Sequence, residues 1–278
     1  MKEKYILKIS CEDQKGLIFK ISSILFENKI NIEKNNEFVD KQNQMFFFRA
    51  RIYGDFQKDE LKQKLKNVLP LNADLYLEKK RKKNIVVMAT KESHALGDLL
   101  IKNYSDELNA NILCVISNHN ILKELTDKFQ IPYFYIDATN KQRLDHEKEV
   151  LEILDNFDFD YIVLAKYMRI LSSDFVKRFE NKIINIHHSF LPAFIGANPY
   201  KQAYDRGVKI IGATAHFVND DLDEGPIIHQ DVIRVNHEFS WKDMQKAGRE
   251  VEKSVLNQAL DLVFDDRVFI YKNKTIIF

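Results

Sequence analysis

The feature that most constrains the fold is a regular alternation of short apolar segments and amphipathic segments between residues 84 and 278. The apolar segments have the character of strands and cover residues 85–89, 112–117, 132–136, 161–165 and 183–187. Helical segments at residues 93–102, 121–129 and 145–156 separate them. Strands that alternate with helices are typical of a mostly parallel sheet, so this part of the chain is expected to form a Rossmann-like α/β domain.

The pattern changes after the last of these strands. Segments 210–218 and 226–235 are predicted to add antiparallel strands to the sheet. A long amphipathic helix is expected over residues 241–263. A closing hairpin of segments 268–271 and 275–278 follows, with its turn at Lys272-Asn273-Lys274.

A charged run, Glu78-Lys79-Lys80-Arg81-Lys82-Lys83-Asn84, precedes the α/β segment. A basic run can mark a nucleic-acid-binding patch or a targeting signal. Here it lies between two strand-like segments, and the formal net charge of the chain is only +1, so we interpret it as a solvated linker. The linker divides the chain into two predicted domains, residues 1–80 and residues 84–278.

The first domain is expected to follow the order β-α-β-β-α-β. A strand at 5–10, a helix at 17–28, a hairpin of segments 38–40 and 45–53, and a helix at 59–69 precede a strand-like segment at 73–77. The first helix has the i, i+3, i+4, i+7 apolar spacing of a helix that packs on one face. This order predicts a ferredoxin-like α+β layer.

Composition excludes several classes of protein. Cys11 and Cys114 are too few and too far apart for a disulfide framework or a metal cluster, and are expected to be small buried hydrophobes. No run approaches the roughly 20 uninterrupted apolar residues that a membrane span requires. The first residues alternate charged and apolar side chains, unlike a secretory signal. The chain is therefore expected to be cytoplasmic and to bind neither a membrane nor nucleic acid.

Two side chains suited to carbonyl chemistry lie on the strand at 183–187. Residues two apart in a strand share a face, so Asn185 and His187 point together while the isoleucines beside them enter the opposite, apolar layer. An amide can donate to an oxygen that becomes negative, and an imidazole can move a proton at neutral pH. Asn185 and His187 are therefore predicted to be catalytic. His188 should face the other way and have a packing role.

An acidic loop, Asn219-Asp220-Asp221-Leu222-Asp223-Glu224-Gly225, joins the two antiparallel segments. Leu222 interrupts the acidic residues and is expected to tuck inward. That would turn Asp223 toward the edge of the sheet, where its carboxylate could charge the imidazole of His187 and order a water. His216, at the end of the preceding strand, is expected either to line the site or to hydrogen-bond this loop.

Histidine and carboxylate side chains are also ordinary zinc ligands. A metal site is therefore an alternative interpretation of His187, His188, His216 and Asp223. The chain has no HExxH motif and no histidine pair at helical spacing, and adjacent strand residues such as His187 and His188 face opposite ways. No metal ion is therefore expected.

Two motifs, Asn185-Ile186-His187 and Leu222-Asp223-Glu224-Gly225-Pro226, resemble those of the folate-dependent formyltransferase catalytic domain. The resemblance implies that Asn185, His187 and Asp223 form a catalytic trio. It also implies that a reduced folate is the substrate, with no separate cofactor. The pterin would bind against the loop after strand 161–165 and beneath the acidic loop, at Met168, Arg169, Ile170, Leu171, Asn219, Asp220 and Asp221.

A narrower resemblance covers nearly the whole chain. His187-His188-Ser189-Phe190-Leu191-Pro192, Gly196-Ala197-Asn198-Pro199-Tyr200 and residues 206–214 are similar to segments of the deformylases related to these transferases. The reaction that this resemblance implies is hydrolysis of 10-formyltetrahydrofolate to formate and tetrahydrofolate. Such a reaction supplies formate for purine biosynthesis and balances the one-carbon folate pool.

The alternative reaction is transfer of the formyl group to an amine acceptor. Family members that formylate a phosphorylated glycinamide carry a glycine-rich loop after the first strand, which holds the phosphate. The corresponding segment here has no glycine before Gly97, and Glu92 would crowd or repel a phosphate. Hydrolysis is therefore favoured. A transferase for an unphosphorylated amine and a non-catalytic effector-binding protein remain as alternatives.

The first domain carries a resemblance of its own. The run Ser10-Cys11-Glu12-Asp13-Gln14-Lys15-Gly16-Leu17-Ile18 resembles the ACT-type amino-acid-sensing module. Such modules pair side by side, which implies a homodimer or homotetramer, and bind small effectors; glycine and methionine are the expected candidates. Gly16 opens the first helix, where free N–H groups can hold a carboxylate. Alternatively, Gly16 is only a turn glycine.

Overall fold

The computed structural model describes residues 3–193 and 199–278, so the predicted segment Gly196-Ala197-Asn198 lies outside the described residues. The chain divides into two compact units, Met1–Arg81 with Phe278, and Lys82–Ile277. Each unit has its own buried core and is described by itself. No helix in the described part of the chain combines the length and the apolarity that a membrane span needs.

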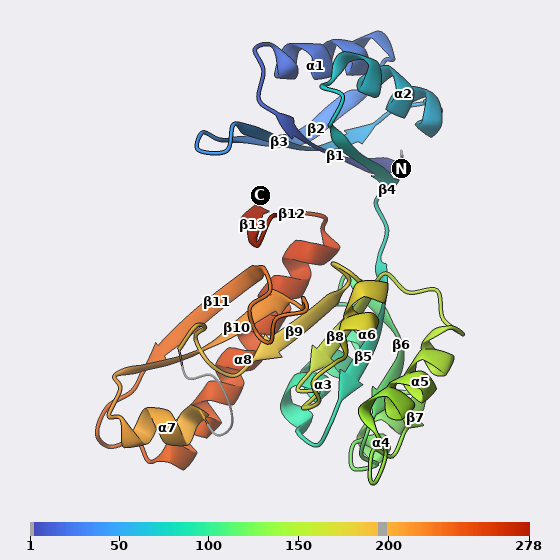
Figure 1. The fold of residues 1–278 in the computed structure, drawn as a ribbon. Coiled ribbons are helices and arrows are strands. Elements are labelled where there is room, and N and C mark those ends of the chain that lie inside the picture. Colours follow the sequence, from blue (N-terminus) through green and yellow to red (C-terminus); the bar gives the residue numbers. More distant parts are fainter. Residues whose placement is uncertain (1–2, 194–198) are drawn as a thin grey trace. The chain divides into compact units, whose positions relative to one another are not determined.

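The first unit is a four-stranded antiparallel sheet of order β2-β3-β1-β4, with two helices on one face (Figure 1). This arrangement confirms the predicted ferredoxin-like order. β2 is much longer than predicted, because its polar residues form a backbone ladder with β3 along most of their length. The elements are β1 (Lys4–Glu12), α1 (Leu17–Glu27), β2 (Asn31–Asp40), β3 (Met45–Tyr53), α2 (Lys58–Val68) and β4 (Asp74–Lys79).

The core of this unit lies between the sheet and its helices. Alternate residues of β1 and β3 point into it, and the apolar stripes of α1 and α2 cover them. Cys11 belongs to this core, and Cys114 is buried in the second unit, so both thiols are buried as predicted.

The second unit contains a seven-stranded sheet of order β11-β10-β9-β8-β5-β6-β7. The five strands from β9 to β7 are parallel, whereas β10 is antiparallel to both of its neighbours, as predicted. The elements are β5 (Lys83–Ala89), α3 (Ser93–Tyr104), β6 (Ala110–Ser117), α4 (Lys123–Asp127), β7 (Tyr133–Tyr135), α5 (Arg143–Leu154), β8 (Tyr161–Ala165), α6 (Ser173–Arg178), β9 (Ile183–His187), α7 (Pro199–Asp205), β10 (Ile210–Phe217), β11 (Ile227–Arg234), α8 (Trp241–Phe264), β12 (Val268–Tyr271) and β13 (Lys274–Ile277).

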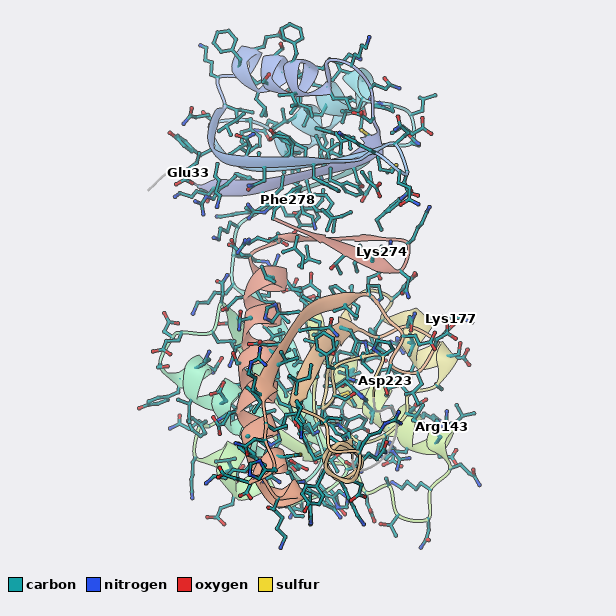
Figure 2. The ribbon with its side chains drawn as sticks, turned by 90° about the vertical axis from the view of Figure 1, so that its left-hand side faces the viewer. Glu33, Arg143, Lys177, Asp223, Lys274 and Phe278 are labelled. Atoms are coloured by element: carbon teal, nitrogen blue, oxygen red, sulfur yellow. The ribbon has the colours of Figure 1, made fainter. Side chains whose placement is uncertain are left out.

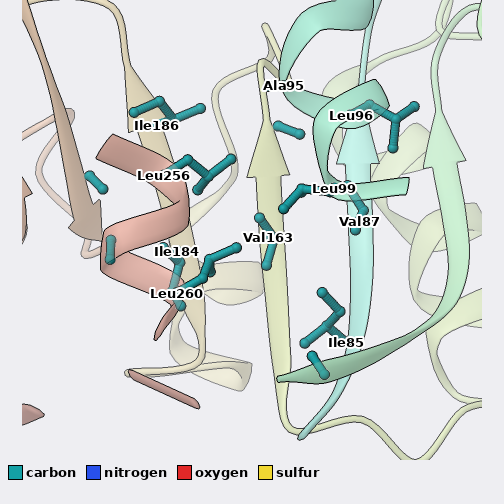
Figure 3. Close-up of a cluster of buried hydrophobic side chains, with 14 of the residues drawn as sticks. Ile85, Val87, Ala95, Leu96, Leu99, Val163, Ile184, Ile186, Leu256 and Leu260 are labelled. Carbon is teal, nitrogen blue, oxygen red and sulfur yellow. The ribbon is translucent and has the colours of Figure 1, made fainter. Parts of the chain in front are cut away.

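Helices cover both faces of this sheet. On one face, α3 and α8 cover one apolar layer that runs from Ile85 and Val87 of β5 to β9, where Leu256 and Leu260 of α8 lie beside Ile184 and Ile186 (Figure 3). Ile184 and Ile186 of β9 lie in this core, as the alternation along the strand predicts. On the other face, α5 and α6 cover the residues of β5 that point the opposite way. The result is an α/β/α arrangement that confirms the predicted Rossmann-like class.

The structure differs from the sequence-based expectation in two local respects. β4 continues to Lys79 and β5 begins at Lys83, so the connection is shorter than the charged run. Lys83 is buried rather than solvated, and its Nζ lies 2.9 Å from Asp266 Oδ1. The pattern also does not predict α6 or α7, because helices of six and seven residues are too short to show a period.

Candidate active site

A cavity of about 320 Å³ lies at the carboxyl ends of β8 and β9. The strand order reverses between β5 and β8, and ligand sites of open α/β sheets lie beside such a reversal. All ten residues of the predicted site line this cavity, so the structure brings together segments far apart in the sequence. They are Met168, Arg169, Ile170, Leu171, Asn185, His187, Asn219, Asp220, Asp221 and Asp223.

Asn185 is held by a neighbouring histidine. It pairs with His216 across β9 and β10, and its Nδ2 donates to His216 Nε2 over 3.2 Å. His216 Nδ1 in turn donates to the Phe217 carbonyl oxygen over 2.8 Å. Burial lowers the pKa of His216, so the ring stays neutral with its proton on Nδ1. His216 thus lines the site and fixes the orientation of the Asn185 amide.

His187 is held by the predicted carboxylate. His187 Nδ1 lies 3.2 Å from Asp223 Oδ1. Burial alone would raise the pKa of Asp223, but the hydrogen bond from His187 lowers it. Among the described residues no group hydrogen-bonds the buried His187 Nε2. An ionised Asp223 therefore orients the ring and leaves Nε2 for a substrate.

Asp223 lies in the second unit on the acidic loop (Figure 2), and the backbone of this loop holds its carboxylate against His187. Asp223 has a φ of 58°, in the left-handed region. A Cβ at Gly225 would lie 1.8 Å from the Phe217 carbonyl oxygen, so only glycine fits there. Leu222 is not buried as expected: it lines the cavity, but its side chain is 56% exposed. Backbone conformation, rather than an apolar anchor, turns the carboxylate inward.

The expected orientation of His188 is also wrong. β9 ends at His187, so strand alternation no longer governs the next residue. The His188 ring stacks on His187 with the centroids 5.1 Å apart, and it lines the same cavity. Burial and the charge of Lys166 lower the pKa of His188 to about 4, so this imidazole is neutral.

The loop after β8 forms the apolar side of the cavity. Met168 and Ile170 are 61% and 54% exposed, so they line the cavity and are not part of the buried core. The loop is tied to the sheet edge, because Thr90 Oγ1 accepts a 3.0 Å hydrogen bond from the Met168 amide. The same hydroxyl donates to Asn118 Oδ1 over 3.0 Å.

Two buried charged residues near the site were missed by the sequence reasoning. Lys166 follows β8 and lines the cavity. Glu252 lies on α8 within a stripe of otherwise apolar residues, and a charge at such a position is a usable signal of a buried contact. No group of three or more potential metal-ligating side chains is found in residues 3–193 and 199–278, and the expectation that no metal is used stays a prediction.

Both units match families of known proteins. Residues 83–260 match the family model for a formyl transferase, and residues 5–70 match the ACT domain. The chain is 52% identical to a formyltetrahydrofolate deformylase of Haemophilus influenzae over 277 residues, which cover 100% of both chains. A crystal structure of a formyltetrahydrofolate deformylase from Pseudomonas syringae pv. tomato matches 100% of this chain and 95% of its own, with a TM-score of 0.95 and 39% identity.

The second unit has transferase relatives as well. The crystal structure of glycinamide ribonucleotide transformylase 1 from Symbiobacterium toebii covers 73% of this chain and 97% of its own, with a TM-score of 0.68 and 28% identity. The full-length matches are to deformylases, and they include the ACT domain. This protein therefore belongs to the formyltetrahydrofolate deformylase family.

Proposed function

We propose that this protein hydrolyses 10-formyltetrahydrofolate to formate and tetrahydrofolate at the cavity beside β8 and β9. The observation that carries the proposal is the His187 imidazole, whose Nδ1 lies against the Asp223 carboxylate while its Nε2 is left without a partner among the described residues. A general base needs this arrangement, with one nitrogen oriented by an anion and the other free for the reacting proton.

The proposed reaction begins with a water beside His187. His187 Nε2 takes one proton as the water oxygen attacks the formyl carbon, and the carbonyl oxygen becomes negative. The second N–H of the Asn185 amide, together with the imidazolium, stabilises this oxyanion. The bond from carbon to N10 then breaks, and N10 takes the proton from His187. The formic acid that remains ionises, so each turnover yields formate, tetrahydrofolate and one proton.

Binding of the folate fits the two loops over the cavity. Met168, Ile170 and Leu171 offer apolar surface for a flat ring, as small-molecule sites commonly do. Asn219 Oδ1 is buried and has no hydrogen-bond partner within the described residues. A pterin presents N–H donors that would satisfy such an acceptor. The proposed contacts of Arg169, Asp220 and Asp221 complete this side.

The test is an assay of formate release from 10-formyltetrahydrofolate with no amine acceptor present. Hydrolysis predicts formate and tetrahydrofolate in equal amounts over many turnovers. A strict transferase would release little formate until an amine is added, and a non-catalytic effector-binding protein would release none with or without the amine.

The first unit is proposed to pair with a second copy and to bind an amino-acid effector. The chain matches the ACT domain, and Phe19 and Phe26 are 74% and 82% exposed on α1. They are seven residues apart, so both rings lie on one face of this helix. Gly16 has a φ of 83°, so the turn alone already requires glycine there. Glycine and methionine remain the proposed effectors, and a homodimer or homotetramer the proposed assembly.

The wider role is proposed on the same basis. The released formate would supply purine biosynthesis, and the released tetrahydrofolate would return to the one-carbon pool. The cytoplasmic location and the absence of a cofactor other than the folate substrate stay predictions.

A further inference from the structure

A cluster of charged side chains lies next to the catalytic cavity. Its centre is Glu252 of α8, which is 1% exposed. Glu252 Oε2 lies 2.9 Å from His94 Nε2 and 3.2 Å from Lys166 Nζ. Glu252 Oε1 accepts a 2.5 Å hydrogen bond from Tyr200 Oη. Burial alone would raise the pKa of Glu252, but the hydrogen bond from His94 and the charge of Lys166 lower it to about 2. The carboxylate is therefore ionised, and side chains from three other segments converge on it.

The cluster continues outward with charges of alternating sign. His94 Nδ1 lies 3.3 Å from Glu92 Oε2, and the same oxygen lies 3.2 Å from Arg249 Nε. Burial alone would lower the pKa of His94, but its hydrogen bonds to Glu252 and Glu92 raise it. Each charge thus has a partner of opposite sign, from the partly exposed Arg249 to the buried Lys166. Paired charges of this kind are held in place, because separating them in a buried site is strongly unfavourable.

This cluster borders the reacting groups through His188. The His188 ring stacks on His187 at 5.1 Å between centroids, and its centroid lies 6.3 Å from that of Tyr200. His188 and Lys166 both line the catalytic cavity. The packing has no slack on the side of α8, since a Cβ at Gly248 would lie 2.2 Å from Tyr200 Oη. The wall beside His187 is therefore made of His188. Behind it lie the fixed side chains of the cluster and, on another side, a separate apolar cavity of about 170 Å³ that His188 and Tyr200 also line.

We propose that His188, Lys166, Glu252 and Tyr200 determine the acceptor by filling the side from which a second substrate would approach. The inference rests on the proposed hydrolysis and concerns why water is the nucleophile. With the folate held by the loop at 168–171 and the acidic loop, as proposed above, the nucleophile would approach past His188 and Lys166, which line another part of the cavity. The related transformylase, by its name, acts on glycinamide ribonucleotide, and its fold must admit that second molecule.

The filled wall discriminates by size. An amine acceptor would have to displace His188 and separate Lys166 from Glu252, which disfavours its binding by roughly a hundredfold or more. A water molecule needs no displacement. The cluster therefore excludes larger nucleophiles without taking part in proton transfer, and its members are specificity-determining residues rather than catalytic ones.

Partition of the formyl group between water and glycinamide, a small amine, tests this proposal. In transfer, the glycinamide nitrogen forms the new bond to the formyl carbon, the bond to N10 breaks, and one amine proton passes to N10. The product is then N-formylglycinamide instead of formate. The wild-type enzyme is expected to form only formate, at a rate that glycinamide does not lower.

The opening variant is Lys166→Ala/Glu252→Ala, which removes both partners of the pair and leaves space. Its ratio of N-formylglycinamide to formate should exceed the detection limit, below which the wild-type ratio stays, by at least about tenfold. The volume-matched variant Lys166→Met/Glu252→Gln keeps the wall filled but removes the ion pair, so it should raise the ratio less than the opening variant does. A control, Lys83→Ala/Asp266→Ala, removes a buried pair at the opposite end of β5 and should keep the wild-type ratio.

Two results would overturn the proposal: N-formylglycinamide formed by the wild type, or an unchanged ratio in the opening variant. The ratio compares two products of one enzyme, so partial unfolding of a variant does not shift it. If the double alanine variant does not fold, His188→Ala opens the same wall and carries the same expectation. Absence of formate from the wild type without any amine would instead contradict the proposed hydrolysis.

Discussion

Individual residues in this site depend on their neighbours for their state. Asp223 is ionised because burial, which alone would raise its pKa, is outweighed by the hydrogen bond from His187. His216 is neutral because it is buried, and it can then accept the Asn185 amide hydrogen. Three side chains of similar chemical type thus have different roles because their surroundings differ: His187 faces a carboxylate, His216 a carbonyl and an amide, and His188 a lysine.

The neutral state of the His188 ring should make the stability of the protein depend on pH. Its pKa is lowered to about 4, so the folded protein stays unprotonated at His188 while the unfolded chain takes up a proton near pH 6.5. Its contribution to stability is therefore present above that pH and falls as the pH drops toward 4. Between pH 7 and 5 the wild type should lose on the order of 1 to 2 kcal/mol more stability than His188→Gln.

Urea unfolding of the two proteins at both pH values measures this difference. Nuclear magnetic resonance of labelled histidine gives a direct control, since the His188 ring should not titrate between pH 5 and 8. A midpoint near 6.5 for His188, or equal pH dependence of the two proteins, would show that the surroundings do not hold this ring neutral.

At the scale of elements, apolar patterning predicts what is buried and misses what is polar. The five parallel strands could be predicted because their residues are apolar, and the apolar layer of β9 follows from alternation. β2 could be only partly predicted, because its polar residues are held by the ladder to β3. The sequence gives the wrong orientation for His188 because β9 ends at His187, so strand alternation does not apply to the next residue. It gives the wrong position for Leu222 because the backbone of the loop, with Asp223 at a positive φ, sets the side-chain directions there.

The conformation of the loop from β10 to β11 depends on Gly225. Gly225→Ala would place a methyl group against the Phe217 carbonyl oxygen, so the loop must move and carry Asp223 away from His187. We expect a loss of about 1 to 3 kcal/mol in the free energy of unfolding and a fall in kcat. Chemical unfolding and acceptor-free formate release measure the two effects. Gly97→Ala is a suitable control, because its added Cβ meets only a side-chain carbon at 3.8 Å.

In the whole molecule, two units with separate cores are joined in one chain. The described residues that line the cavity at β8 and β9 all belong to the second unit. The division follows from the sequence, because the periodicity changes on either side of the charged run. The effector, the assembly and the sign of regulation do not follow from it, since they depend on surfaces between copies rather than on one chain's pattern.

The proposed pairing of the first unit predicts the oligomeric state of the full chain. Sedimentation of the full chain should show a dimer or tetramer, and Phe19→Ser/Phe26→Ser should shift it toward the monomer, since these exposed rings are the proposed contact. Formate release should respond to glycine or methionine in the wild type and lose that response in the variant. A monomeric wild type that no amino acid affects would leave the first unit without either proposed role.

The central claim is that His187 activates water for attack on the formyl group. The most direct measurement is acceptor-free formate release by His187→Ala beside the wild type, with unfolding curves to establish that both proteins are folded. We expect a folded variant whose kcat is lower by at least about 100-fold. A folded variant that releases formate at a near-wild-type rate would contradict it.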